Sequence, residues 1–350
     1  LCVGCKACKR ECPTGVDMAR MKMELQAMRA RKVGLTAGQR LVAYLPRYAP
    51  LLAPLAGLLN SAAALPGSRR LRESLTGLTR QRPLPLWERD SGLARMTSAG
   101  PDTGTEVVVL LDTFTRWFEP ANGQALVEVL TEAGCRVHVA RPEKGRPLCC
   151  GRTFLSAGLI DQARTEARRL ITALRPYLER GIPLVGIEPA CLLTLRDEYT
   201  GLFSSTELRG LDKMALLLEE YLVRHQSSLS LNLGPLPVNH AALHCHCHQK
   251  AFATAGDVET VLGWIPDLQV DPIASSCCGM AGDFGQWAQT YGVSMAMGEL
   301  SLLPAVRDLT AESDIGAGGT SCRQQSSHGS GRVAVHYVQL LQSALAAGSK

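Results

Sequence analysis

The sequence predicts an α/β protein built from two similar α/β units, with an α-helical segment in front of them. Two observations lead to this fold class. From Glu106 onward, strand-length apolar runs alternate with amphipathic helical stretches, a pattern typical of mostly parallel sheets. The triplet Cys-Cys-Gly (CCG) also occurs twice, at residues 149–151 and 277–279, and each copy is followed by a further cysteine, at 191 and 322. Matching spacing on this scale indicates two copies of one structural unit.

The first element is a run of four closely spaced cysteines. Cys2, Cys5, Cys8 and Cys12 follow the spacing C-x2-C-x2-C-x3-C, with Pro13 directly after them. Bacterial-type ferredoxins bind a 4Fe–4S cluster with this run, and there the cysteine before the proline ligates the other cluster of a pair. A single zinc ion or a knot of disulfides fits the spacing less well, because zinc sites use more widely separated pairs and disulfides need relaxed geometry.

We therefore expect Cys2, Cys5 and Cys8 to surround one cluster and Cys12 to turn away from it. Pro13 is expected to begin the first helix, where a missing N–H costs nothing. The sequence contains no second run of this kind, so its sister motif is expected upstream, in a longer protein. The alternative is that all four cysteines close on one cluster.

Residues 1–35 are thus expected to form a ferredoxin-type segment, and residues 36–104 a helical connector without strands. Apolar residues at helical spacing predict a helix with one stripe, expected to pack beneath the cluster: Met18, Met21, Leu25 and Met28. In the connector, prolines interrupt the apolar stretch 41–65, which predicts short helices and not a membrane span. These helices either pack in the core or lie on a partner or a membrane surface.

The two units are expected at residues 105–228 and 229–350. In the first, strands are predicted at 106–112, 135–140 and 183–191, with helices at 121–134 and 160–174. In the second, strands are predicted at 241–248, 268–273 and 313–322, with helices at 258–264, 280–303 and 333–347. We expect a pseudo-twofold relation that turns both CCG triplets toward a common cleft.

A CCG turn is a plausible site for a soft metal. The glycine can adopt a positive φ and let two neighbouring thiols reach one centre, and a following helix N-terminus is expected to lower their pKa values. A vicinal disulfide or two inert buried cysteines are the alternatives.

The cysteines of the two units divide into two sets. The second unit offers four candidate ligands: Cys247, Cys277, Cys278 and Cys322. The first unit offers Cys149, Cys150 and Cys191, with Asp112-Thr113 where the second has a cysteine. This first set is either incomplete, lends ligands across the pseudo-dyad, binds zinc, or binds nothing. Cys135, on an apolar strand, is expected in the core.

The composition narrows the function classes. Thirteen cysteines without a visible secretion signal indicate reduced thiols in a reducing compartment. The net charge of +5 comes without the motifs or interleaved aromatic residues of a nucleic-acid binder, so no nucleic-acid partner is expected. A strand followed by G-x-G-x-x-G and a P-loop are both absent from the sequence, which gives no sign of a dinucleotide site.

The amino-acid sequences of several segments resemble those of a known family. "CKACKRECPTGVDMARMK", "LLDTFTRWFEP", "RPLCCGRTFLSAGLIDQAR", "EPACLLTLRDEY" and "HCHQKAF" are similar to the C-terminal iron–sulfur half of bacterial fused FAD/iron–sulfur D-2-hydroxy-acid dehydrogenases. The layout also resembles the cysteine-rich subunits of glycolate oxidase, anaerobic glycerol-3-phosphate dehydrogenase and heterodisulfide reductase. The likeness covers nearly the whole chain and is weakest at 33–101. Where the heterodisulfide reductase pattern ends each unit in C-x2-C, this sequence has Thr194 and Gln325.

This resemblance implies an electron-transfer module that is not active alone. A flavoprotein domain carrying FAD, upstream or on a separate chain, would oxidise a 2-hydroxy acid of the D-lactate, D-2-hydroxyglutarate or glycolate type. Electrons would pass through a 4Fe–4S cluster, and through a second iron–sulfur cluster or zinc-type site at the CCG cysteines, to a quinone or another acceptor. The expected location is the cytoplasm, with peripheral contact at the cytoplasmic face of the membrane. Thiol–disulfide catalysis at the CCG site and a zinc-stapled docking module are the alternatives.

Overall fold

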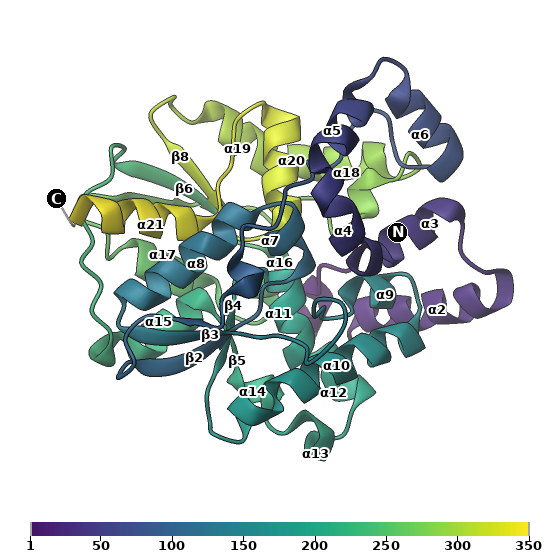
Figure 1. Ribbon diagram of the computed structural model, residues 1–350. Coiled ribbons are helices and arrows are strands. Elements are labelled where there is room, and N and C mark those ends of the chain that lie inside the picture. Colours follow the sequence, from purple (N-terminus) through teal and green to yellow (C-terminus); the bar gives the residue numbers. More distant parts are fainter. Residues whose placement is uncertain (1, 349–350) are drawn as a thin grey trace.

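The computed structural model describes residues 2–348 and confirms the α/β fold class (Figure 1). Within these residues the strands form two sheets, each covered by helices. The strands are β1 (Ser98–Ala99), β2 (Thr105–Val109), β3 (Cys135–Val139), β4 (Leu184–Gly186), β5 (Ala215–Leu217), β6 (His240–His244), β7 (Gln269–Pro272) and β8 (Asp314–Ala317).

The two sheets share one strand order. The five-stranded sheet has the order β1-β3-β2-β4-β5, in which β1 is antiparallel to β3 and the other pairs are parallel. The three-stranded sheet is fully parallel and has the order β7-β6-β8. In each, the first strand of the unit lies between the second and the third, so β2, β3 and β4 correspond to β6, β7 and β8. This shared topology is what a repeated unit predicts.

Helices fill the connections. The N-terminal and connecting part contains α1 (Ala7–Glu11), α2 (Met18–Val33), α3 (Ala37–Ala43), α4 (Leu45–Leu52), η1 (Ala53–Leu55), α5 (Ala56–Ala64), α6 (Ser68–Thr76) and η2 (Leu93–Arg95). The five-stranded sheet carries α7 (Thr113–Trp117), α8 (Pro120–Glu132), α9 (Arg152–Ser156), α10 (Ile160–Leu178), α11 (Pro189–Arg196), α12 (Glu198–Leu202), α13 (Ser205–Leu208), α14 (Leu211–Met214), α15 (Leu218–His225) and η3 (Gln226–Ser228). The three-stranded sheet carries α16 (Cys247–Ala251), α17 (Ala255–Leu262), η4 (Phe284–Gln286), α18 (Tyr291–Glu299), α19 (Leu302–Asp308), α20 (Thr320–Ser330) and α21 (Tyr337–Gly348).

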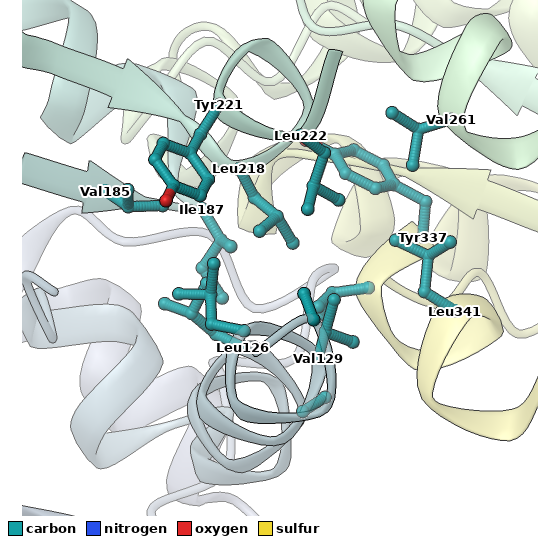
Figure 2. Close-up of a cluster of buried hydrophobic side chains, with 14 of the residues drawn as sticks. Leu126, Val129, Val185, Ile187, Leu218, Tyr221, Leu222, Val261, Tyr337 and Leu341 are labelled. Carbon is teal, nitrogen blue, oxygen red and sulfur yellow. The ribbon is translucent and has the colours of Figure 1, made fainter. Parts of the chain in front are cut away.

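The two units share one hydrophobic core. Helix α8 of the first unit packs on α21 of the second, and α17 of the second packs on α15 of the first. Figure 2 shows the contact: Leu126 and Val129 of α8 face Leu222 of α15, with Tyr337 and Leu341 of α21 beside them. Because each unit covers the other's apolar helices, the cysteine-bearing loops of both units are held in a fixed relation. Cys135 lies fully buried in this core, as expected.

The apolar connector forms short helices, as predicted. Among the described residues no single helix is long and apolar enough to cross a membrane, although the bent pair of segments Ala37–Ala43 and Leu45–Ala64, at 74° to each other, reaches the required length and composition together. The connector also contributes β1 to the first sheet, contrary to the expectation that it holds no strand.

The predicted packing of the α2 stripe is wrong. Met21, Leu25 and Met28 are more than half exposed, and the helix instead buries Ala19 and Ala27, two turns apart on another face. The backbone at Ala27 lies close to the turn after α9, at Gly158, and Met23 of α2 packs against the cluster of Phe154 and Leu155.

Two helix boundaries also differ from the prediction. Pro13 lies in a turn between α1 and α2 and does not begin a helix, because α2 starts at Met18 with Asp17 as its N-cap. The long helix expected over 280–303 is broken into η4, α18 and α19. At Gly285 an added Cβ would lie 2.4 Å from the Ser294 hydroxyl oxygen, so the chain folds back on itself there and does not continue as a helix.

We expect Gly158→Ala to destabilise the docking of α2. Gly158 has φ +77°, and a Cβ there would lie 2.4 Å from the backbone of Gln26 in α2. The control Gly181→Ala has the same left-handed backbone, φ +74°, with nothing within 4 Å of the added carbon, and carries only the conformational cost of about 1–2 kcal/mol. Denaturant unfolding should show a loss for Gly158→Ala that is larger by about 1–3 kcal/mol. Equal losses would show that α2 does not pack on this turn.

Candidate metal centres

The N-terminal cysteines lie at the surface of the second unit. The Gly4 carbonyl accepts a hydrogen bond from His248 Nε2 at 3.2 Å, and Lys22 Nζ donates to the Cys2 carbonyl at 2.7 Å. Helix α1 contacts α16, which begins at Cys247. The contacts place the start of the chain beside α16.

Three of the four N-terminal cysteines form a group, called here the N-terminal thiol set: Cys2, Cys5 and Cys8. Burial raises the pKa of Cys5, and the neighbouring thiols of Cys247, Cys2 and Cys8 raise it further. The backbone N–H of Met18, the first residue of α2, donates to Cys8 Sγ at 3.3 Å. The Cys5 thiol therefore lies near the second unit's cysteines as well as its own neighbours.

Cys12 has a different environment. Its Sγ lies 3.1 Å from the Thr14 hydroxyl oxygen, and this hydrogen bond, with nearby backbone N–H groups, lowers the pKa of Cys12. The hydrogen bonds that lower its pKa come from Thr14, Val16 and Gly15.

The second thiol set comprises Cys247, Cys277, Cys278 and Cys322, and the structure brings all four together. The thiols form a continuous hydrogen-bonded series in that order, from Cys247 to Cys322. Cys247 begins α16, the CCG pair lies in the loop after β7, and Cys322 lies in α20. His244, at the end of β6, also belongs here, since its ring nitrogen and the sulfurs of Cys278 and Cys322 lie within 4.8 Å of one another.

The first thiol set comprises Cys149, Cys150 and Cys191. Cys150 hydrogen-bonds with both of the others, and the Thr113 hydroxyl bonds to Cys149. Thr113 begins α7 as Cys247 begins α16, so it occupies the place of the missing fourth thiol. The first set therefore matches the second, with an oxygen in place of one sulfur.

The two CCG turns have the same local geometry. Gly151 and Gly279 both have left-handed backbones, with φ of +81° and +88°. Each glycine N–H donates to the sulfur of the first cysteine of its triplet, at 3.3 Å to Cys149 and 3.4 Å to Cys277. The turn thus folds back on its own first thiol, as the need for a positive φ predicts.

The expected lowering of the CCG pKa values is wrong. The pKa of Cys149 lies well above its ordinary value, first because of its hydrogen bond with Cys150 and then because of burial. The pKa of Cys247 is raised likewise, by its hydrogen bond with Cys277 and by burial. In the second unit no helix follows directly, since α18 begins only at Tyr291. Such buried, crowded thiols ionise together only when a cation compensates them.

Buried charges surround the thiol sets. The Arg152 guanidinium, next to the first CCG triplet, pairs with Glu198, and its positive charge acts on Cys150, Cys191 and Cys247. Burial lowers the pKa of Arg152, but the charge and hydrogen bond of Glu198, together with the nearby Cys150 and Cys191, raise it by more. One fixed cation thus lies near cysteines of both sets.

Glu188 joins the helices that carry the distal cysteines. Its carboxylate caps α11, accepting from the Ala190 N–H at 3.3 Å, and accepts from the Thr320 N–H of α20 at 2.9 Å. Burial, and then the neighbouring Asp112, raise the pKa of Glu188 to about 7. The N-termini of α11 and α20 therefore meet at one carboxylate.

His244 and Arg152 were absent from the predicted site. The segment "HCHCHQK" shows three histidines at alternate positions, but this spacing does not tell which of them faces the thiols. Arg152 follows the first CCG triplet directly, and its positive charge beside two cysteines was the signal available in the sequence. All thirteen cysteines, which lie within the described residues, are free thiols.

Comparison with known proteins supports the resemblance. Residues 111–196, which include the first thiol set, match the family model of the CCG cysteine-rich domain. The chain is 27% identical over 250 residues to a subunit of the anaerobic glycerol-3-phosphate dehydrogenase of Escherichia coli K12, covering 70% of this chain and 62% of that protein. It is 25% identical over 357 aligned residues to the D-2-hydroxyglutarate dehydrogenase of Pantoea ananatis, covering 97% of this chain and 33% of that protein.

A third relative is the lactate utilization protein A of Bacillus velezensis, 24% identical over 209 residues, which cover 57% of this chain and 82% of that protein. The chain thus spans less than two thirds of the first two relatives. It contains a cysteine-rich CCG domain, and its relatives include dehydrogenases and a dehydrogenase subunit.

Proposed function

We propose, from this relationship to CCG-containing dehydrogenase proteins, that the chain is the iron–sulfur electron-transfer module of a FAD-linked D-2-hydroxy-acid dehydrogenase. Electrons would enter from a flavoprotein domain outside this chain and leave to a quinone or another acceptor. The relatives named for D-2-hydroxyglutarate and for lactate utilization support the substrate class. One structural observation carries the proposal: the Cys5 thiol of the N-terminal set lies close enough to Cys247 of the second set for Cys247 to raise the pKa of Cys5. The two candidate metal centres are therefore neighbours, as transfer of electrons between them requires.

The residues present fit an iron–sulfur cluster at the N-terminal thiol set. Cys2, Cys5 and Cys8 supply soft sulfur donors, and the Met18 N–H donates to Cys8 Sγ, the kind of hydrogen bond that tunes a cluster's reduction potential. An iron–sulfur cluster bound there would accept and release single electrons. Cys12, bonded to Thr14, is free to ligate a different centre.

The chain's own groups position the N-terminal thiol set. His248 holds the Gly4 carbonyl, so the loop between Cys2 and Cys5 is fixed to the second unit. Lys6, almost fully buried, ties the same loop to Asp197 and Glu198 of the first unit. The N-terminal set is thereby held against both units at once.

Metal and sulfide analysis tests the proposal. The 350-residue chain, purified without oxygen and reconstituted with iron and sulfide, should bind iron at the N-terminal set only weakly, because its three thiols leave one ligand to be supplied from elsewhere, and should give an electron paramagnetic resonance signal when reduced. Cys5→Ser should lose this iron and signal, whereas the matched core variant Cys135→Ala should keep both. Stoichiometric zinc without iron would reject electron transfer and support a zinc-stapled docking module.

The same measurements on Cys12→Ser decide its role. We expect this variant to keep the iron of the N-terminal set, because the Cys12 sulfur is hydrogen-bonded to the Thr14 hydroxyl and nearby backbone N–H groups. Loss of iron equal to that of Cys5→Ser would show that all four cysteines close on one cluster.

A further inference from the structure

One ring nitrogen of His244 is buried without a hydrogen-bond partner among the described residues. The residue is fully buried at the end of β6, and its Nε2 has no hydrogen-bond partner in the part of the chain that the structure describes. That ring approaches the sulfurs of Cys278 and Cys322, with all three ligand atoms within 4.8 Å of one another. A buried polar atom without a partner is costly, so its persistence requires a reason.

The hydrogen bonds of the other ring nitrogen are compatible with a proton on Nδ1. His244 Nδ1 lies 2.8 Å from Ser275 Oγ. When the Ser275 hydroxyl donates its single proton to the Ile273 carbonyl, at 3.3 Å, it accepts from Nδ1–H. A neutral imidazole protonated at Nδ1 carries a lone pair at Nε2. Histidines that bind metals are commonly oriented in this way, by a partner of the nitrogen that does not ligate.

We propose that His244 is a nitrogen ligand of the metal centre in the second thiol set, through Nε2 and beside Cys278 and Cys322. This inference rests on the proposed binding of metal by that set. A mixed set of thiolate and imidazole donors suits zinc or iron. The short separations suit a compact site, because two sulfurs on one tetrahedral ion with Zn–S of about 2.3 Å lie about 3.8 Å apart.

The first unit provides an internal comparison. His244 lies three residues before Cys247, and the corresponding position three residues before Thr113 is Leu110, which is buried in an apolar cluster. The unit with four thiols thus also has the imidazole, and the unit with three thiols has neither the fourth sulfur nor the nitrogen. A nitrogen donor is therefore a feature of the second set.

Cobalt(II) binding to the metal-free full chain tests this role, since its visible spectrum reports the donor atoms. Wild-type chain should show thiolate charge-transfer and d–d bands, of which the part lost in Cys278→Ser belongs to the second set. His244→Gln should weaken that part of the binding at least tenfold and shift its d–d bands. Ser275→Ala, which keeps the imidazole but removes its orienting partner, should weaken it about 10–100-fold.

His240→Gln is the matched control. His240 lies on the same strand, with its ring on Ser313 and Asp271 and away from the thiols, so its variant should bind as wild type does. Unchanged affinity and d–d bands in a folded His244→Gln would overturn the role of His244 alone. If Cys278→Ser removes no cobalt signal, the metal-binding proposal for the second set fails as well. Should His244→Gln fail to fold, the Ser275→Ala result decides.

Discussion

Lys6→Met should release the N-terminal segment from the rest of the protein. The Lys6 side chain is 1% exposed, pairs with Asp197, and lies 3.0 Å from Glu198 and 3.5 Å from Asp17. Burial opposes its charge, but attraction by Glu198 and Asp197 outweighs burial and raises the pKa of Lys6. Removing Lys6 leaves Glu198 with Arg152 and Asp197 with Lys9 alone, and loss of one partner of a buried charge network costs up to about 3–5 kcal/mol.

The effect should appear where the segment docks. We expect limited proteolysis to cut residues 2–33 much faster in Lys6→Met, and denaturant unfolding to show the loss of free energy. Lys9→Met is the control, because Lys9 Nζ pairs with the same Asp197 at 2.7 Å but is 35% exposed. Such a partly exposed pair is worth about 0–1 kcal/mol. Similar behaviour of the two variants would show that Lys6 does not anchor the segment.

Much of the fold could be predicted because apolar runs of strand length and apolar residues at helical spacing are both clear in this sequence. The run "EVVVLLD" is apolar at every interior position, as a parallel strand buried on both faces requires, and its first four residues lie in β2. Strand β5 could not be found in this way. Its residues, Ala215–Leu217, continue directly into α15, and only pairing with β4 distinguishes them from helix.

The contacts between distant segments lay outside the reach of the sequence. Spacing identified every cysteine of the second thiol set, yet it could not reveal that Cys5 lies beside Cys247, since no local pattern encodes that docking. The predicted packing of the α2 stripe is wrong for a related reason. Periodicity shows that a helix has an apolar face, but not which face packs against the neighbouring helix. In α2 the buried face carries the alanines.

Glu219→Gln should make the protein more stable at pH 8 and remove part of its pH dependence. Glu219 is buried between the units, where it accepts hydrogen bonds from the Tyr337 hydroxyl at 2.6 Å and from Gln249 Nε2 at 2.5 Å. Burial raises the pKa of Glu219 to about 7, and these hydrogen bonds offset only part of that effect. A glutamine can keep both contacts, because the Tyr337 hydroxyl can accept from the amide while the amide oxygen accepts from Gln249.

The sign follows from proton binding. Between about pH 4.5 and 7 the folded state holds a proton on Glu219 that the unfolded chain has released, so the free energy of unfolding falls as pH rises. The contribution is fully present below about pH 4.5 and is lost by about pH 7, in total about 3 kcal/mol. Denaturant unfolding at a series of pH values should therefore show the difference between Glu219→Gln and wild type growing across this window and levelling above it. The exposed control Glu128→Gln should give a flat difference, and a flat difference for Glu219→Gln would mean that Glu219 titrates as an ordinary carboxyl group.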